Sequence, residues 1–336
     1  MVYKMTPKGQ LTSLYQFDFT HGGGPIGLVQ GTDGDFYGTT EVGGTGKLGV
    51  VFKITSRGKL TVLYNFDGPH GSEPIGPIIQ ASDGKFYGTT YRGGTNNIGV
   101  VYKMTPTGAL TVLHNFNVGD AFPSAGLVQA TDGKFYGAAS RGTATGHGQL
   151  FQITSKGKYT VLRNFPQHGG AAGSVPFVSL FQHTNGTFYS DTYDGGAPAC
   201  HGGCGVLYSL GMKLGPFVSF VGPLSSGKVG KTIEILGQGF TGTTNVSFNG
   251  VSATFAVVSD TYLTAMVPAN ATTGSVTVTT PGGPLTSNKV FRVTPRDPEL
   301  QPDQRAGGNS GDDYRNQLHR RDQGHVRRSE SHHVLG

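Results

Sequence analysis

The chain has 336 residues, including 56 Gly, 18 Pro, 20 Phe and 14 Tyr, and only 14% of them are charged. So much Gly argues against a helical protein, and so many aromatic residues argue against a disordered one. The net charge of +6 is thinly spread, which excludes the clustered Lys and Arg of a nucleic-acid-binding surface. The sequence contains no run of about 18 apolar residues, so it predicts no membrane-spanning helix. The composition therefore predicts an all-β protein with many turns.

A segment of about 50 residues recurs through the first two thirds of the chain. The segment VYKMTPKGQLTSLYQF returns three times with small changes and once in a degenerate form, so that copies begin at Val2, Val51, Val101, Leu150 and Val206. A second motif, TDGDFYGTT, stays in phase with it and has its turn at Asp33, Asp83, Asp132 and Asn185. Periods of this size are typical of solenoids and propellers.

Each unit is predicted to form four short strands, at residues 26–30, 36–40, 49–55 and 59–66 in the first complete copy. Asp-Gly pairs are strong hairpin signals, and four antiparallel strands per unit are typical of a propeller blade. We therefore expect a β-propeller of about four to five blades that is incomplete at its N-terminus. The sequence does not determine whether these blades close into a ring. The Asp-Gly pairs supply too few oxygen ligands for calcium loops. The Phe-Tyr pairs suggest packing between blades rather than sugar platforms.

These units resemble the Gloeobacter/Verrucomicrobia tandem repeat, or GloVer repeat. The resemblance rests on Gly-Val-Val-Phe-Lys-Ile-Thr, Leu-Tyr-Asn-Phe and Asp-Gly-Lys-Phe-Tyr-Gly-Thr-Thr, and it covers about residues 2–221. It implies a bacterial surface or secreted protein with many repeats and a variable anchor. The family has no assigned activity, so the resemblance suggests a location rather than a chemistry.

A different pattern begins after Gly222. Short alternating segments at residues 226–240, 245–250, 261–268, 271–278 and 290–293 predict an immunoglobulin-like sandwich. This part is similar to the IPT/TIG family over nearly its whole length. Such domains contact DNA in some families, but the few basic residues here are opposed by acidic ones. We expect a spacer or a protein-binding module. The predicted domains are residues 1–222 for the propeller and 223–294 for the sandwich.

Residues 295–336 follow no strand pattern and carry equal numbers of basic and acidic residues, seven of each from Arg296 onward. One interpretation is a disordered charged tail. Back-translation from Glu299, read one base later, can give a sequence that follows the pattern of residues 226–255. We therefore expect a second IPT/TIG domain that is encoded out of frame. In that case the Arg and His pairs of this tail form neither a metal site nor a basic patch.

Two cysteines and a set of loop residues are the candidate sites. Cys200 and Cys204 lie four apart in one loop, which suggests a small disulfide, with free thiols as the alternative; a zinc site is the least favoured interpretation, because only His201 is near as a further ligand. Residues in the connectors between units could form a ring that holds a metal or a ligand, although their spacing drifts and exposed loops are the simpler interpretation. The candidate ligand-contact residues are His21, His70, Tyr91, Arg92, Asp120, Arg141 and His168.

No catalytic motif appears, and we predict no catalytic residue, no cofactor and no bound metal. The chain is therefore expected to be a non-enzymatic, secreted or cell-surface protein with a binding, adhesion or scaffold role. Its partner would be an extracellular protein or glycan, with no nucleic acid and no membrane insertion. A carbohydrate-binding propeller is one alternative. Another is a propeller lyase or hydrolase with a His-based metal site.

Overall fold

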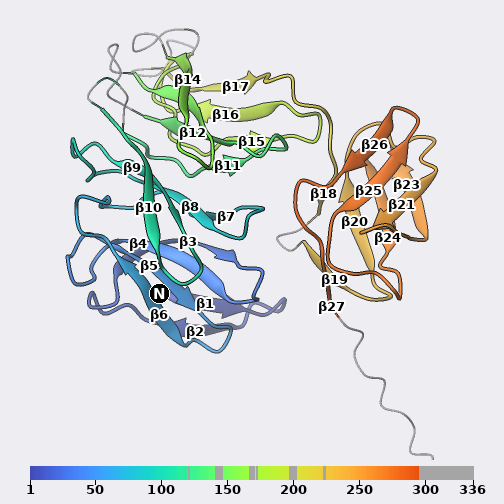
Figure 1. Cartoon of the computed structure of the whole chain (residues 1–336), viewed down its shortest axis with the longest axis horizontal. Helices are drawn as coiled ribbons and strands as arrows, with labels where there is room; N and C mark the ends of the chain where they lie inside the picture. Colours follow the sequence, from blue (N-terminus) through green and yellow to red (C-terminus); the bar gives the residue numbers. More distant parts are fainter. Residues whose placement is uncertain are drawn as a thin grey trace, which may run out of the picture. The chain divides into compact units, whose positions relative to one another are not determined.

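The structure is a computed structural model, and it describes residues 1–117, 119, 122–140, 147–165, 171, 173–196, 203–221 and 225–294. Every regular element in these residues is a strand (Figure 1). Nowhere in the described part does a helix have the length and apolar character needed to span a membrane. The all-β prediction is confirmed. The predicted tail, residues 295–336, lies outside the described residues.

The first part of the chain forms a series of antiparallel sheets in which sheet order follows chain order. We call the two-stranded sheet the half-blade and the next four sheets blades 1 to 4. The half-blade contains β1 (Val2–Met5) and β2 (Leu11–Tyr15). Blade 1 contains β3 (Gly23–Gln30), β4 (Phe36–Val42), β5 (Val50–Ile54) and β6 (Leu60–Asn65). Blade 2 contains β7 (Ile79–Gln80), β8 (Phe86–Thr90), β9 (Val100–Met104) and β10 (Leu110–Asn115).

The later blades repeat this plan, but the last one is shorter. Blade 3 contains β11 (Val128–Gln129), β12 (Phe135–Ala139), β13 (Gln149–Ile153) and β14 (Tyr159–Asn164). Blade 4 contains β15 (Phe181–Gln182), β16 (Phe188–Thr192) and β17 (Val206–Leu210), so it has three strands. The β-propeller prediction is confirmed, with three complete blades between a half-blade and a three-stranded blade.

Aromatic side chains pack each blade on the next. Tyr37 of β4 lies 4.1 Å, between ring centroids, from Phe86 of β8. The next two interfaces repeat this contact, with Tyr87 at 4.0 Å from Phe135 and Tyr136 at 4.5 Å from Phe188. Neighbouring side chains in a strand point to opposite faces. In the Phe86-Tyr87 and Phe135-Tyr136 pairs the Phe therefore packs on the preceding blade and the Tyr packs on the following blade, which confirms their predicted role between blades.

The third strands divide their side chains in the same way. In β5, Phe52 and Ile54 join the buried cluster that contains Val2 of the half-blade. Val51, between them, joins the cluster that contains Tyr102 of blade 2. We call the side of a blade that carries Val51 or its equivalents the forward face, and the side that carries Phe52 and Ile54 the backward face. Each interface joins a forward face to the backward face of the following blade.

A recurring glycine allows the third and second strands to meet closely. Gly99 precedes β9 with a φ of +101°, and a Cβ atom there would collide with the carbonyl oxygen of Thr90. Gly49 and Gly148 hold the equivalent positions with φ of +94° and +95°. Only glycine adopts such angles without strain. The Gly of the Gly-Val-Val motif is therefore required by backbone geometry.

The remaining strands form the sandwich (Figure 1). One sheet has the order β18-β20-β24-β23 and the other the order β22-β21-β25-β26, while β19 and β27 pair in parallel. The strands are β18 (Ser219–Phe220), β19 (Ser226–Lys228), β20 (Thr232–Leu236), β21 (Asn245–Phe248), β22 (Val251–Ser252), β23 (Phe255–Ser259), β24 (Tyr262–Met266), β25 (Val276–Thr280), β26 (Gly283–Thr286) and β27 (Arg292–Thr294). Because β18 pairs with β20, the first strand of this sheet precedes Gly222.

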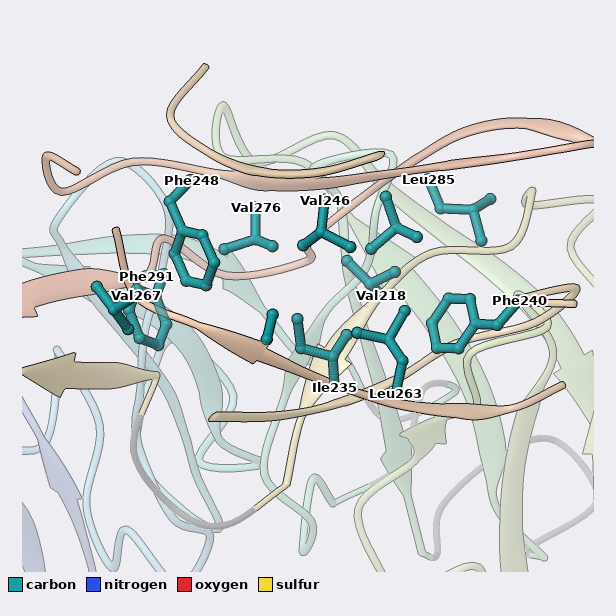
Figure 2. Packing of buried hydrophobic residues seen from close by; sticks show 12 residues of the cluster. Val218, Ile235, Phe240, Val246, Phe248, Leu263, Val267, Val276, Leu285 and Phe291 are labelled. Atoms are coloured by element: carbon teal, nitrogen blue, oxygen red, sulfur yellow. The ribbon is translucent and has the colours of Figure 1, made fainter. Parts of the chain in front are cut away.

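The core of the sandwich lies between its two sheets. Val246, Val276 and Leu285 on one side point toward Ile235 and Leu263 on the other in Figure 2. These side chains alternate along their strands with more exposed ones, as expected for sheets with one buried face. The predicted immunoglobulin-like fold is confirmed for this part of the chain.

Candidate functional site

One end of the blades gathers the loops that contain the predicted contact residues. Asn115 at the end of β10 pairs with Val100 at the start of β9, which pairs in turn with Thr90 at the end of β8. The connector to the next blade and the loop between the second and third strands therefore leave the sheet at the same end. We call this end of blades 1 and 2 the connector face. It consists of residues 17–25, 41–49, 66–74 and 91–99 with Phe122.

Hydrogen bonds between main-chain atoms hold the two kinds of loop together. The Gly94 N–H donates to the Gly68 carbonyl oxygen at 2.8 Å, and the Tyr91 N–H donates to the Glu73 carbonyl oxygen at 2.9 Å. Ser72 and Arg92 exchange two further bonds of 2.8 and 3.1 Å. Because these loops are tied to each other and to the sheet, the side chains that they carry are held on a rigid support.

Each of the two described connector histidines is bound to an aspartate three residues before it. His21 Nδ1 lies 2.9 Å from Asp18 Oδ2, and its backbone N–H donates to Asp18 Oδ1 at 2.8 Å. His70 and Asp67 repeat this arrangement at 2.7 and 2.9 Å. All four side chains are about half exposed. The Asp-x-x-His unit is therefore a local turn that orients the imidazole through its Nδ1 atom.

The aspartates of these units favour their charged form. The backbone N–H of His21 is the main cause that lowers the pKa of Asp18, with a further contribution from the imidazole. Burial alone would raise the pKa of Asp67, but the hydrogen bonds from the backbone and side chain of His70 outweigh it and lower the pKa overall. Each carboxylate thus forms its hydrogen bonds with the histidine three residues after it.

The connector histidines do not combine into a metal centre within the described residues, where no group of three His, Cys, Asp or Glu side chains is placed to hold an ion. The equivalent residues of the next two connectors, Asp120 and His168, lie outside the described part. The predicted ring of connector residues therefore stays a prediction.

Blade 2 places an aromatic and charged group on the connector face. Tyr91 packs against Phe122 with ring centroids 5.0 Å apart, and the Arg92 guanidinium lies 5.7 Å from the Tyr91 ring. Arg92 Nε is 3.3 Å from Glu73 Oε2, with both side chains partly exposed. An exposed ion pair of this kind contributes about 0–1 kcal/mol to stability. Its charges remain available to a ligand. The predicted Arg141 lies outside the described residues.

A left-handed residue precedes the proline of three connectors. Gly24, Glu73 and Val175 have φ of +64°, +54° and +59°. In Glu73 the N–H donates to the Leu48 carbonyl oxygen at 3.0 Å while its own carbonyl oxygen accepts from Tyr91. Val175 makes the same two bonds with His147 and Tyr193. A left-handed conformation costs a residue with a Cβ atom about 1–2 kcal/mol. The blade-to-loop hydrogen bonds maintain it at a position next to Tyr91 and Arg92.

A hollow of about 430 Å³ lies between the connector and the loop of blade 2. Its walls are Gly68, Pro69, Gly93, Gly94, Thr95 and Asn97. The Asn97 side-chain oxygen already accepts the Gly93 N–H at 2.9 Å. The hollow is therefore lined mainly by backbone and offers few free side-chain groups for recognition.

The opposite end of the blades uses its aspartates for turn structure. Asp83 accepts the Tyr87 hydroxyl at 2.9 Å, and Asp132 accepts that of Tyr136 at 3.0 Å. In blade 1, Asp33 accepts both the Tyr37 hydroxyl at 2.7 Å and the Lys53 ammonium at 2.8 Å. The recurring Asp-Gly turns thus connect their carboxylates to the tyrosines between blades, which supports the turn interpretation over calcium loops.

The cysteine prediction is only partly within the described structure. Cys204 is disulfide-bonded. Cys200 lies outside the described residues, so the pairing of these two cysteines stays a prediction.

Sequence reasoning missed several members of the connector face. Asp18 and Asp67 could have been found from the Phe-Asp-x-x-His pattern, which occurs at Phe17 and Phe66. Glu73 and Phe122 had no comparable signal. They contact Arg92 and Tyr91 through a connector whose course the repeat alone does not determine.

Comparisons with known proteins agree with the repeat pattern and with the blades. The family model of the Gloeobacter/Verrucomicrobia repeat matches residues 1–208. The chain belongs to the Gloeobacter/Verrucomicrobia repeat family. The model of the IPT/TIG domain matches residues 216–293 of this repeat protein, which confirms the predicted combination. No curated protein matches the sequence significantly.

Solved structures that resemble the repeat protein include enzymes. A periplasmic gluconolactonase from Pseudomonas aeruginosa has 13% identity and a TM-score of 0.40, over 84% of this chain and 85% of its own. A gluconolactonase from Xanthomonas campestris has 13% identity and a TM-score of 0.36, over 73% and 72%. The PQQ-bound aldose sugar dehydrogenase from Streptomyces coelicolor has 14% identity and a TM-score of 0.35, over 51% and 57%.

These structures correct one prediction. The sequence was expected to encode a protein that is not an enzyme, whereas named gluconolactonases are among the structures that resemble it. The non-enzymatic assignment is therefore withdrawn. At this identity and TM-score the similarity assigns no activity, substrate or cofactor to the repeat protein.

Proposed function

We propose that the repeat protein is a secreted or cell-surface binding scaffold whose connector face contacts an extracellular glycan or protein. One observation carries this proposal. Blade 2 holds Tyr91, Phe122, Arg92 and Glu73 together on loops that are fixed by main-chain hydrogen bonds. Rigid aromatic rings beside available charges are the residue types that supply most of the affinity in binding sites.

The difference between the residues packed between blades and the residues at the connector end supports this role. Residues between blades are buried and bind one another, as Tyr87 binds Phe135 and Asp83. The residue at one equivalent position near this end differs between blades, where Thr40, Thr90, Ala139 and Thr192 are followed by Glu41, Tyr91, Ser140 and Tyr193. Scaffolds that present loops on a repeated framework vary these positions and keep their packing. The IPT/TIG domain would act as a spacer or as a second protein-binding module.

A carbohydrate is the ligand class that the Tyr91 and Phe122 rings favour. Sugar rings have apolar faces that stack on aromatic side chains, and Arg92 and Glu73 can donate to and accept from their hydroxyl groups. The experiment is a glycan array with the purified full chain and with the double variant Tyr91→Ala/Arg92→Ala. We expect a binding signal that falls at least tenfold in the double variant.

A matched control keeps this test specific. The double variant Lys231→Ala/Tyr262→Ala removes a cation and an aromatic ring from the sandwich, and it should leave binding unchanged. The Tyr91→Ala/Arg92→Ala chain must also keep the circular dichroism and melting temperature of a folded protein. Binding that survives in the connector-face variant, or that is lost equally in the sandwich variant, would contradict the proposed site.

A further inference from the structure

The sandwich has one sheet edge without the features that normally prevent an edge strand from pairing with another chain. Edge strands present free main-chain N–H and C=O groups, and most are protected by short length, proline, charged side chains or bulges. Of the four edges of the two four-stranded sheets, β18 and β22 have only two residues each. The edge strand β26 contains Pro284. The fourth edge strand, β23, has five residues and no proline.

Charged residues do not protect β23 either. No Lys, Arg, Asp or Glu occurs between Glu234 and Asp260 in the sequence. Asp260, which follows the strand, already accepts the N–H groups of Gly239 and Thr241 at 3.3 and 3.2 Å. A strand without charges can lie opposite a copy of itself without repulsion between like charges. The composition of β23 therefore favours a second copy of this chain as its partner.

The main-chain groups of Phe255 and Val257 lie on the open side of β23. The Met266 N–H of β24 donates to the Thr254 carbonyl oxygen at 2.9 Å, and Ala256 lies two residues further along the same register. Main-chain bonds alternate along an antiparallel pair, so Thr254 and Ala256 bond to β24. The N–H and C=O groups of Phe255 and Val257 point away from β24, to a side where the described part of the chain has no strand.

The side chains of β23 alternate between the two faces of the sheet. Phe255 packs against the core of the sandwich, so Ala256 points to the outer face and Val257 to the inner face. Val257 is 39% exposed, at the margin of the core. The register shift of β23 lies between Val257 and Ser259. The bulge therefore leaves residues 255–257 regular and able to pair with another strand.

We propose that β23 pairs antiparallel with β23 of a second copy of this chain, across a two-fold axis at Ala256. Phe255 of each copy would exchange two main-chain hydrogen bonds with Val257 of the other, and their side chains would cover each other on the inner face. The two Ala256 side chains would meet at the axis, where their small size permits a close approach. The contact uses the same surface on both copies, so it closes as a dimer and does not grow further. It lies in the sandwich and is independent of the connector face.

Sedimentation velocity of the full chain from about 1 µM to about 500 µM tests the association, because weak contacts between protein surfaces fall in this range. We expect the average mass to rise with concentration toward that of a dimer and not beyond it. Val257→Pro removes an N–H that faces the open side of an edge strand, where proline is tolerated. This variant should keep its fold and weaken the dimer at least about tenfold.

Charges at the two-fold axis test the register. Ala256→Lys and Ala256→Glu each place two like charges opposite one another, and each should weaken the homodimer about fivefold or more. An equimolar mixture of these two variants should form a heterodimer at least as tight as the dimer of the unmodified chain, because Lys then lies opposite Glu. The matched control Thr232→Lys adds the same charge at an exposed position of the same sheet, but β24 separates its strand from β23. It should dimerise like the unmodified chain.

Circular dichroism and the melting temperature establish that each variant is folded. If Val257→Pro does not fold, the two Ala256 variants and their mixture still decide the question. A chain that stays monomeric over the whole range would overturn the proposal, as would a mass that grows beyond a dimer. A folded Val257→Pro chain that dimerises unchanged, or a mixture of the Lys and Glu variants no tighter than either variant alone, would also overturn it.

Discussion

The stacking of Tyr87 on Phe135 is predicted to couple blade 2 to blade 3 energetically. The rings are 4.0 Å apart and inclined by 24°, and the two side chains are 0% and 1% exposed. A double-mutant cycle with Tyr87→Leu, Phe135→Leu and the combined variant isolates the contact from the burial of each ring.

The magnitude follows from the geometry. Each single change removes part of a fully buried ring and should cost about 1–3 kcal/mol in the free energy of unfolding. A stacked aromatic pair contributes about 0.5–1.5 kcal/mol beyond its buried area. The combined variant should therefore lose less than the sum of the single variants, by about 1 kcal/mol. Urea unfolding monitored by far-UV circular dichroism measures these free energies.

A distant pair and an uncovered ring serve as controls. Tyr87 and Phe188 belong to different interfaces, so their cycle should show a coupling below about 0.3 kcal/mol. Tyr189→Leu should cost less than Tyr87→Leu, because Tyr189 makes no contact with the Phe of a following blade in the described structure. A coupling between Tyr87 and Phe135 that is no larger than that of the distant pair would refute the stacked-blade reasoning.

Three further predictions concern turns and loops. Gly99→Ala should destabilise the chain by about 2–5 kcal/mol, because it places a Cβ atom on a left-handed backbone and this atom collides with the Thr90 carbonyl oxygen. Gly84 also has a left-handed backbone but open space around it, so Gly84→Ala should cost about 1 kcal/mol. Equal losses of the free energy of unfolding in urea would contradict this. For Asp33, burial raises the pKa, but the bonds from Lys53 and Tyr37 outweigh it and lower the pKa below its usual range. Its stabilising contribution is therefore present above the unfolded pKa of about 3.9 and lost as pH falls through the lower folded value. The stability difference between the unmodified chain and Asp33→Asn should then shrink from pH 7 to pH 3, and a constant difference would count against the assignment. Finally, mass spectrometry should find no alkylated Cys204 before reduction and complete alkylation after it; a labelled thiol in the unreduced protein would exclude the disulfide.

Much of the fold can be predicted from the sequence, because the turns and the apolar residues recur at the same positions of each repeat. The Asp-Gly turns and the alternating strands define the hairpins, and the neighbouring Phe and Tyr must face opposite sides of a strand. The inter-blade contacts of Tyr37 with Phe86 follow directly from that alternation. The sandwich was equally accessible, since its buried valines alternate along β21 and β25.

The connector face was less predictable because it depends on contacts between segments whose spacing varies. Glu73 meets Arg92 only because a left-handed residue and two main-chain bonds turn the connector against the loop. The connector histidines suggested one shared metal or ligand site, whereas His21 and His70 each bind the aspartate three residues before them. The sequence pattern indicated which loops lie together, but not which side chains satisfy one another inside them.

Amide hydrogen exchange in dilute, monomeric protein tests the central claim most directly. The claim is that each blade is covered by the blade that follows it, and that the forward face of blade 4 is exposed. Val100–Met104 in β9 and Val206–Leu210 in β17 hold the same position in their blades. Amides of β9 should exchange at least about a hundredfold more slowly than those of β17, because β9 is paired on both sides and covered on both faces. Equal protection of the two strands would contradict the stacked-blade account.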